Sequence, residues 1–492
     1  MALRRVHAPQ IDFTPLRREL KLPDSYPPDA QREAERAASQ PGPGERADRT
    51  DIPFVTIDPA TSQDLDQAMC LRRRPGGGYR VHYAIADVAW FVRAAPALEA
   101  ETWRRGQTVY LPDGKVPLHP PVLSEGAASL LAGQVRPAVV WTVDLDADGA
   151  PVAVHLERAL VRSRAKLDYV GVQSDVDGGG APEPVALLPE VGKLLVARGL
   201  ARGAINLPIP EQEVERDGDG WRLRLRPPRP VEEYNAQISL LTGVCAARIM
   251  LDGGLGLLRT MPAPSSEAVA RLRAAAPALG VRWPDGAGVG TVIAGLDLSD
   301  PRSAAFLDQA AELMRGAGYS AFDRSGPQGG AGRAGPVVDG PPPADPVHGA
   351  VAAPYAHVTA PLRRLADRYA TEVCLALHSG VEVPDWAGRA LPELPEVMST
   401  TDHVANAAER GAVDLTEAVV LAGRVGEVFD AAVLDVNGAG DRRAPGGVVA
   451  LDDPPVRARC EGDGLPLGGR VRVRLAVADP AQRHVLFRLE NS

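Results

Sequence analysis

The sequence predicts an α+β protein whose last segment is a small all-β barrel. Between residues 51 and 160, apolar residues alternate with polar ones, as Val81, Tyr83 and Ile85 do, which indicates strands. Further on, apolar residues at helical spacing from Ile238 to Ile249 indicate a helix packed into a core. Residues 421–492 return to short strands with turns between them. The pattern therefore predicts mixed sheets and helices followed by a β-domain.

The composition narrows the class of protein. The 492 residues suffice for about two to four domains, and 45% hydrophobic residues is ordinary for a globular core. The net charge of −9 argues against a protein that coats nucleic acid nonspecifically, although it is compatible with a local basic channel. Cys70, Cys245, Cys374 and Cys460 lie far apart, which supports neither a zinc site nor a disulfide framework.

Residues 1–50 are expected to form an arm on the main domain, because they are too short and polar for an independent RNA-binding barrel. They contain one helical pattern, at Pro28–Ser39. No continuous apolar region follows the N-terminus, and no run approaches the roughly 18 apolar residues of a membrane span. We therefore expect a soluble, cytoplasmic protein without a membrane segment.

The segment FVTIDPATSQDLDQAM, residues 54–69, combines a strand with a group of carboxylates. Phe54–Ile57 is the predicted strand, and Asp58, Asp64 and Asp66 follow it. Several carboxylates at the end of a strand favour a hard cation, and two such ions activate water in phosphodiester hydrolysis. A solvated acidic turn explains the spacing equally well. A calcium loop fits less well, because the central Gly and the distal Glu are absent.

A second informative segment follows a Gly/Pro-rich stretch at residues 323–347, which predicts a mobile surface loop. Pro361 is placed as the first residue of a helix, with Arg363 in the first turn. A helix start offers free N–H groups and a positive dipole end, so with Arg363 it predicts a phosphate-binding position. A surface helix with solvated arginines is the alternative. The predicted apolar stripe comprises Leu362, Leu365, Tyr369, Val373 and Leu377.

The tail has the strand rhythm of a small five-stranded barrel of the oligonucleotide-binding kind. Val471, Val473 and Leu475 alternate with arginines in the run RVRVRL. A generic small β-domain is the alternative.

Taken in order, these blocks resemble the RNB-domain exoribonucleases, the ribonuclease II and ribonuclease R family. The acidic segment followed by VHYAIADVAWFV is similar to the opening signature of that family. YAHVTAPLRRLADRY resembles its arginine signature, and residues 406–410 contain its Ala-Glu-Arg. Three further blocks lie between or beside these in the family's order: TVYLPDGKVPLHPPVLSEGAASL, AKLDY and VEEYNAQISLLTG. The resemblance covers roughly residues 51–420.

The resemblance implies a processive 3′-to-5′ exoribonuclease that hydrolyses single-stranded RNA to nucleoside 5′-monophosphates, in RNA decay or processing. Its fold would be an RNB catalytic domain at residues 51–420, with mixed sheets and helices around an RNA channel. A divergent OB-like RNA-binding barrel would follow at residues 421–492. The expected cofactor is Mg²⁺, with Mn²⁺ as an alternative ion. The expected partner is the 3′ end of single-stranded RNA, with no nucleotide cofactor and a monomeric chain.

By the same resemblance, Asp58, Asp64, Asp66 and Gln67 fall on the positions around Mg²⁺. Asp66 and Arg363 are the predicted catalytic residues, the arginine holding the scissile phosphate and stabilising developing charge. The predicted RNA-binding residues are Tyr169, Tyr355, His357, Arg364 and Glu409. Of these, Tyr169 would stack on terminal nucleotides, and Glu409 would bond a ribose 2′-hydroxyl or serve local packing.

Three departures from the family pattern matter. Gln67 stands where the family commonly has a second adjacent aspartate, which removes one negative charge and predicts weaker metal binding. Asp87, which also follows an apolar strand, can join the acidic cluster or cap the next turn. Ala360 replaces a serine and so removes a predicted helix cap worth about 1 kcal/mol. Cold-shock-type barrels are not expected within the first 50 residues. An RNA-binding protein with chemistry weakened by Gln67 is therefore the alternative function.

Overall fold

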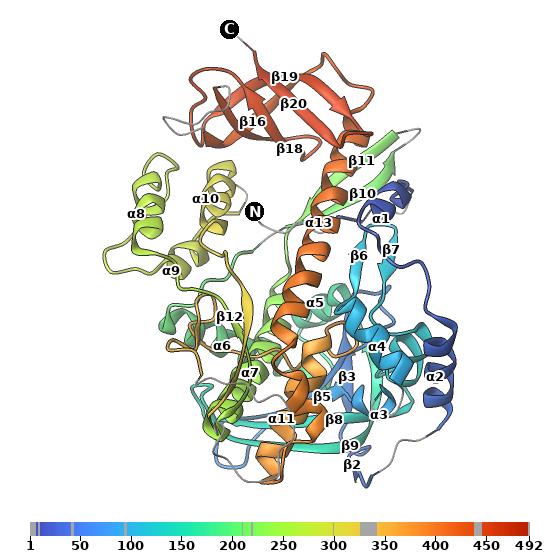
Figure 1. The fold of residues 1–492 in the computed structure, drawn as a ribbon. Coiled ribbons are helices and arrows are strands. Elements are labelled where there is room, and N and C mark those ends of the chain that lie inside the picture. Colours follow the sequence, from blue (N-terminus) through green and yellow to red (C-terminus); the bar gives the residue numbers. More distant parts are fainter. Residues whose placement is uncertain are drawn as a thin grey trace.

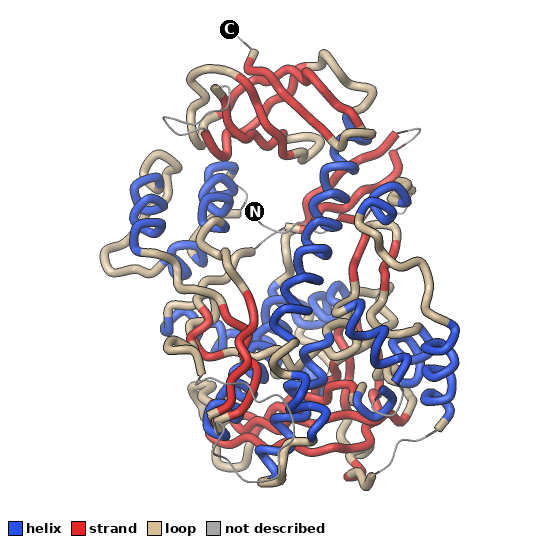
Figure 2. Tube along the Cα trace, viewed as in Figure 1, coloured by secondary structure: helices blue, strands red, loops and turns tan. Residues whose placement is uncertain are grey.

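The structure is a computed structural model that describes residues 6–490 apart from 8–9, 41–43, 93–95, 209, 218–219, 299, 325–341 and 437–444. The predicted loop at 323–347 therefore lies largely outside the described residues. Figure 2 shows that strands gather mainly at the two ends of the molecule, with helices around and between them. None of the described helices is long and apolar enough to cross a membrane.

The centre of the larger end is a six-stranded mixed sheet. Its longest strand, β9, pairs antiparallel with β8 and parallel with β3, so the sheet closes on itself. In sheet order the strands are β2 (Ala47–Asp48), β9 (Pro151–Leu167), β3 (Phe54–Ile57), β4 (Gln67–Arg73), β5 (Tyr79–Ala86) and β8 (Val135–Leu145).

Successive residues of a strand point to opposite sides of a sheet, and in β3, β4, β5 and β8 residues on both faces are buried, whereas β9 has more exposed positions. On one face Val55, Met69 and Tyr83 belong to the main core, which includes residues of α7 and α11. On the other face Phe54 and Ala84 pack with residues of α2, α3 and α4. These helices lie together beside the sheet in Figure 1. The alternation read from the sequence is therefore confirmed, with both sets of residues inside.

Helices and small hairpins surround the sheet. The helices of the larger end are α2 (Pro28–Ser39), α3 (Ala89–Val92), α4 (Pro96–Arg105), α5 (Tyr169–Asp177), α6 (Leu188–Arg202), α7 (Pro230–Gly253), α11 (Leu365–Ser379) and α12 (Asp385–Ala390), with the short turns η1 (Leu123–Ala127) and η2 (Glu183–Val185). The paired strands beside them are β6 (Val109–Leu111) with β7 (Gly114–Val116), β12 (Leu255–Thr260) with β13 (Gly318–Asp323), and β14 (Val347–His348) with β15 (Ala353–Pro354).

The predicted C-terminal barrel is confirmed as a closed five-stranded barrel. Its strands are β16 (Val428–Val436), β17 (Gly446–Leu451), β18 (Arg457–Glu461), β19 (Arg470–Asp479) and β20 (His484–Leu489). The long helix α13 (Leu394–Leu421) runs from the sheet region to this barrel in Figure 1. Phe429, Val473 and Phe487 of the barrel share a core with Ala408 and Ala412 of that helix.

Two further units meet the barrel. Helix α1 (Thr14–Glu19) packs on α13 so closely that a Cβ at Gly411 would meet Leu16 at 2.8 Å. The helices α8 (Ser266–Ala275), α9 (Val289–Ala294) and α10 (Pro301–Ala311) form their own core with Leu434 of β16. An ion pair between Asp308 and Arg457 adds to that contact. The remaining sheet comprises β1 (Val6–His7), β10 (Glu211–Asp217) and β11 (Gly220–Arg226).

Candidate active site

The acidic loop, residues 58–66, connects β3 to β4. These strands are antiparallel neighbours, so the residue after one and the residue before the other meet at the same edge of the sheet. Asp58 follows β3, and its backbone N–H donates to Leu167 O at 3.1 Å. Leu65 N–H donates to Ser129 Oγ at 3.0 Å, which fixes the other end of the loop. The loop is thus anchored on both sides.

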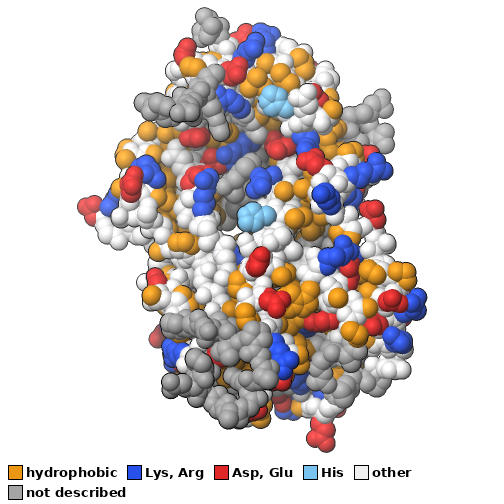
Figure 3. All heavy atoms as spheres, viewed as in Figure 1, with side chains coloured by type: hydrophobic (Ala, Val, Ile, Leu, Met, Phe, Trp, Pro, Cys, Tyr) orange, Lys and Arg blue, Asp and Glu red, His pale blue; other side chains and the backbone are white. Residues whose placement is uncertain are grey.

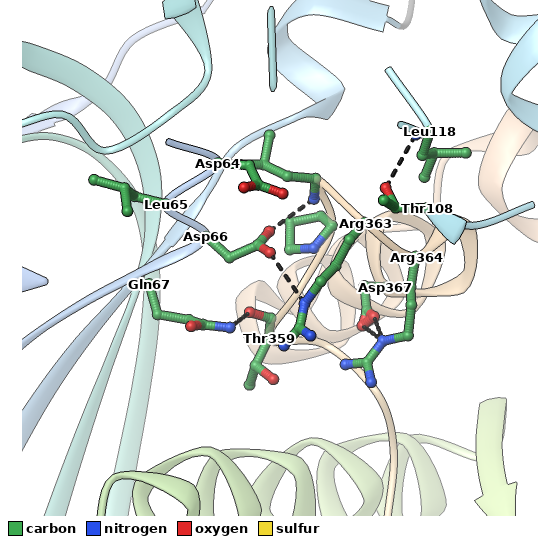
Figure 4. A network of polar contacts seen from close by, with 12 residues as sticks. Asp64, Leu65, Asp66, Gln67, Thr108, Leu118, Thr359, Arg363, Arg364 and Asp367 are labelled. Carbon is green, nitrogen blue, oxygen red and sulfur yellow. Dashed lines mark hydrogen bonds and ion pairs between the residues drawn. The ribbon is translucent and has the colours of Figure 1, made fainter. Parts of the chain in front are cut away.

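Asp66 is the most enclosed of the three carboxylates, with 3% of its surface exposed. Its Oδ1 accepts a hydrogen bond from the Leu362 backbone N–H at 2.7 Å, and its Oδ2 lies 3.4 Å from Arg363 Nε. Figure 4 shows the carboxylate between these two groups. Burial raises the pKa of Asp66 to about 8, although the charge of Arg363 opposes that rise. Residues 296 positions apart, Asp66 and Leu362, thus meet at this point.

Asp64 and Asp58 differ in their partners. Lys115 Nζ lies 2.7 Å from Asp64 Oδ1 and 2.9 Å from Glu125 Oε1. By contrast, Asp58 Oδ2 is buried without a hydrogen-bond partner among the described residues. Burial raises the pKa of Asp58 to about 7, with Arg363 opposing and Asp64 adding to the rise. The mutual influence of the carboxylates is consistent with one shared acidic site.

The arginine turn, residues 359–364, differs from its prediction. The helix begins at Leu365 rather than at Pro361, and Arg363 precedes it instead of lying in its first turn. Arg364 is extended, with φ −136° and ψ 126°, and forms a β-bridge with Gln107. Backbone bonds at 2.9 Å from Thr108 N–H to Arg363 O and from Leu365 N–H to Gly106 O hold this bridge. The predictions of a helix start at Pro361 and of a lost cap at Ala360 are therefore wrong.

The alternative of a solvated surface helix is also wrong. All residues of α11 from Leu365 to Ala376 are buried. Arg364 Nε donates to both oxygens of Asp367, at 2.8 and 3.2 Å. The side chain of Arg363 is 38% exposed, while the Leu362 N–H of the turn is taken up by Asp66. The phosphate-binding capacity of this segment therefore rests on the Arg363 guanidinium rather than on a helix dipole.

Gln67 points its amide nitrogen at the arginine turn and donates to Thr359 O (Figure 4). The Thr359 hydroxyl lies 2.8 Å from Ser239 Oγ of α7, so a polar chain joins β4, the turn and α7. A carboxylate at position 67 has no N–H and could not make the first of these bonds. Asp87 pairs instead with Arg46 at 2.8 Å and Arg158 at 3.2 Å, so its charge does not compensate for Gln67.

The predicted RNA-binding residues are found in two settings. Tyr169 opens α5, its hydroxyl accepts from Asn235 at 2.9 Å, and burial together with the charge of Asp58 raises its pKa to about 12. The ring therefore lies within electrostatic reach of the acidic loop. Tyr355 is buried and His357 is half-buried, and their rings meet edge to face at 5.4 Å, so each covers part of the other's stacking surface. His357 Nδ1 lies 2.7 Å from the Tyr319 hydroxyl.

Glu409 is half-buried on α13, next to Ala408, which packs in the core shared with the barrel. Another α13 residue, Asp402, reaches the surroundings of the arginine turn. Its carboxylate accepts from Gln107 Nε2 at 2.8 Å and from Arg259 Nη1 at 3.1 Å. Asp402 and Glu409 are seven residues apart on the helix, which corresponds to about 10 Å, so the two side chains lie in different surroundings.

The donor types around the acidic loop suit a hard cation, and the partnerless Asp58 Oδ2 is a free ligand atom. The positions of these side chains in the structure are less suited to holding a cation. Among the described residues, no three His, Cys, Asp or Glu side chains are placed to hold a metal ion together. Lys115 and Arg363 instead pair with Asp64 and Asp66. The predicted ligands Asp58, Asp64, Asp66 and Gln67 therefore lie around one loop without forming a gathered set.

Sequence inspection missed several residues that shape this site. Lys115 is one of only four lysines, with Lys21, Lys166 and Lys193, which could have drawn attention to it. His119 Nε2 lies 3.2 Å from Pro361 O and holds the arginine turn from another side. No local pattern marks His119, because its partner is 242 positions away.

Comparison with known proteins matches two family models to this chain. The family model described as RNB domain matches residues 46–378, and the model described as RNase II-type exonuclease C-terminal S1 domain matches residues 427–490. Ribonuclease R of Escherichia coli is 26% identical over 497 residues, covering 91% of this chain and 58% of that protein. A protein named inactive exonuclease DIS3L2, from Arabidopsis thaliana, is 40% identical over 133 residues, covering 27% of this chain and 13% of the relative.

Among solved structures, Mycoplasma genitalium RNase R in complex with ribose methylated single-stranded RNA has the same fold. The TM-score is 0.81 at 19% identity, and the match covers 98% of this chain and 78% of that one. The chain spans less than two thirds of the length of the two curated relatives above.

Proposed function

The chain belongs to the RNB-domain exoribonuclease family, and on that premise we propose that it is an Mg²⁺-dependent, processive 3′-to-5′ exoribonuclease. It hydrolyses single-stranded RNA to nucleoside 5′-monophosphates, in RNA decay or processing. The observation that carries the proposal is the meeting of Asp66 with the Leu362 N–H and Arg363. This contact joins a carboxylate suited to a cation with a guanidinium suited to a phosphate.

In the proposed reaction, Asp58, Asp64 and Asp66 hold the divalent cation, for which Mn²⁺ is an alternative. When bound, the cation supplies an activated water and charge stabilisation at the leaving oxygen. Arg363 binds the non-bridging oxygens of the last phosphodiester through its exposed guanidinium. The water oxygen forms a bond to phosphorus while the bond from phosphorus to the 3′ oxygen breaks. The water loses a proton to solvent, the 3′ oxygen takes up a proton from solvent, and the 5′-mononucleotide leaves.

The RNA itself contacts a small set of groups. Tyr169 stacks on a terminal base. Three residues support the arginine turn from within. His357 Nδ1 lies at hydrogen-bond distance from the Tyr319 hydroxyl, the Tyr355 ring packs edge to face on His357, and Arg364 donates to Asp367. Glu409 is proposed as a more distant RNA contact on α13. We keep the division into an arm at 1–50, a catalytic domain at 51–420 and an RNA-binding barrel at 421–492 as part of this proposal.

The proposed partner is the 3′ end of single-stranded RNA, bound by a monomer. The cytoplasm is the proposed location. Cys70, Cys245, Cys374 and Cys460 are all buried free thiols, which suits a reducing compartment.

A second candidate function is an RNA-binding protein whose chemistry is weakened. The observation favouring it is Gln67, whose amide nitrogen is committed to Thr359 O where a ligand carboxylate is expected. A relative named an inactive exonuclease is similar in sequence to 27% of this chain. This function predicts RNA binding without mononucleotide release.

One assay separates the two functions. Poly(A) labelled at its 3′ end is incubated with purified protein in Mg²⁺ or in EDTA, beside poly(A) labelled at its 5′ end. The enzyme releases labelled 5′-mononucleotide at once from the first substrate. Because it is processive, it converts the second to a short labelled end product without accumulating intermediate lengths. Both reactions occur only with the metal.

Asp66→Asn keeps an oxygen that accepts the Leu362 N–H, and it should lower the rate on the order of 10³-fold. The exposed Asp285→Asn is the matched control and should retain full activity. Binding of both substrates without release would establish the second function instead.

A further inference from the structure

Lys115 occupies an unusual position beside the acidic loop. It lies on β7, and its Nζ bridges Asp64 Oδ1 at 2.7 Å and Glu125 Oε1 at 2.9 Å. Glu125 comes from η1, so three separate segments meet at one ammonium group. The side chains of Lys115, Asp64 and Glu125 are 21%, 12% and 26% exposed, which limits screening by water.

The bridge is a charged one. Lys115 Nζ lies within ion-pair distance of two carboxylate oxygens, so its ammonium places a positive charge against a carboxylate assigned to the cation. An ammonium and a divalent cation on the same carboxylate repel each other strongly at such separations.

Glu125 gives the ammonium a second place to bind. A lysine side chain is flexible and its three N–H donors are not restricted to one plane, so it can leave one carboxylate and keep the other. The other oxygen of Asp64, Oδ2, has the Tyr110 hydroxyl only at 3.4 Å. The Asp64 carboxylate thus lies closer to Lys115 Nζ, at 2.7 Å, than to the Tyr110 hydroxyl.

We infer that Lys115 is a built-in counter-ion that a divalent cation displaces from Asp64, and that Glu125 retains it in the loaded site. The inference rests on the proposed function, since it concerns the same cation. Lys115 and Glu125 are therefore positioning residues that set the affinity for the metal rather than groups that touch RNA.

The test measures metal binding directly, without RNA. Mn²⁺ is titrated into metal-free protein, and free Mn²⁺ is followed by its electron paramagnetic resonance signal. Lys115→Met removes the charge and keeps the stem, and it should tighten Mn²⁺ binding about three- to tenfold. Glu125→Gln leaves Lys115 with Asp64 as its charged partner and should weaken binding about two- to fivefold.

Two controls separate displacement from a general change of charge. Arg17→Met removes a cation paired with Asp113, two residues from Lys115, and should leave Mn²⁺ affinity unchanged. In the double variant Lys115→Met/Glu125→Gln, the effect of Glu125→Gln should largely vanish, because no ammonium remains to be retained. Independent charges would instead give additive changes. Melting curves in EDTA verify that each variant folds.

The outcomes decide between the inference and its premise. If the wild type binds Mn²⁺ and Lys115→Met binds no tighter, the counter-ion role is wrong while the proposed metal site stands. Additive effects in the double variant also overturn the counter-ion role. If neither wild type nor Lys115→Met binds Mn²⁺ at millimolar concentration, both the role and the metal-dependent function fail. Tighter binding by Lys115→Met with a non-additive double variant supports the inference.

Discussion

Arginines gather in two places in this chain, around the start of α11 and on β19 of the barrel, and the two groups differ in burial. Arg368 of α11 is 3% exposed beside Glu99, and Arg364 is 22% exposed beside the buried Asp367, while Arg363, at 38%, is the most exposed of the three. On β19, Arg470 and Arg474 are each 49% exposed. Ion pairs that are buried are costly to break, whereas exposed pairs contribute little and exchange readily.

The β19 arginines are balanced by neighbours on the same surface. Arg470 Nη1 lies 2.6 Å from Asp452, and Arg474 Nη2 lies 2.7 Å from Glu490. The register places Asp430 opposite Arg472. On the face drawn in Figure 3, basic and acidic side chains are interspersed rather than gathered in one basic field. A run of arginines in the sequence therefore does not by itself predict a phosphate-binding surface.

The largest effect is expected at Arg363. Arg363→Met removes the only guanidinium paired with Asp66 among the described residues and should slow poly(A) cleavage about 10²- to 10³-fold. Single-turnover cleavage measures this rate, and filter binding of poly(A) should change far less. Arg389→Met is the control, because its ion pair with Asp385 is exposed. A loss below tenfold would remove Arg363 from the catalytic role.

The next effect concerns stability. Arg368 Nη2 donates to Glu99 Oε1 and to the Tyr369 hydroxyl, both at 2.5 Å. Arg368→Met leaves Glu99, which is 30% exposed, without its cation, and should lower the free energy of unfolding by about 3 kcal/mol. Urea unfolding followed by circular dichroism measures the change, again with Arg389→Met as control. Equal midpoints for the two variants would show that burial does not distinguish these arginines.

The sequence predicted those parts of the fold that depend on local periodicity. The strand Phe54–Ile57, the helix Pro28–Ser39 and the five-stranded barrel are examples, because strands and helices repeat every 2 and about 3.6 residues. The helix start at Pro361 was wrong because a distant β-bridge to Gln107 extends Arg364. That competing interaction has no trace in the local pattern.

The contacts around the candidate site were harder to predict than the proximity of two of its residues. The resemblance located Asp66 and Arg363, and the structure brings these two together. It gave no indication that Lys115 would pair with Asp64. It also could not show that Tyr355 lies buried, because burial depends on how α7 and the turn pack. Partners that are hundreds of residues apart are set by tertiary packing alone.

A smaller effect is expected from the polar link between β4 and the arginine turn. Gln67→Leu removes the amide N–H that donates to Thr359 O, and Thr359 is only 3% exposed. The free energy of unfolding should therefore fall by about 1–2 kcal/mol. Thermal melting measures this cost, and the exposed Gln482→Leu serves as control. Cleavage by Gln67→Leu should fall severalfold, because Arg363 loses a support of its turn. Unchanged melting would show that the link does not hold the turn.

The smallest effect is expected on the barrel. Because Arg470 and Arg474 already pair with Asp452 and Glu490, replacing both arginines by Ala should change the Kd for poly(A) less than about threefold. The converse variant, Asp452→Asn/Glu490→Gln, frees the two arginines and should tighten binding. It should also steepen the dependence of log Kd on log salt by about 1.4 units, since each of the two new phosphate contacts on a single strand contributes roughly 0.7. A large loss of affinity in the arginine variant would mean that RNA displaces the carboxylates. The exposed ion pairs would then open to bind phosphate when RNA is present. Burial would no longer distinguish arginines that bind RNA from arginines that do not.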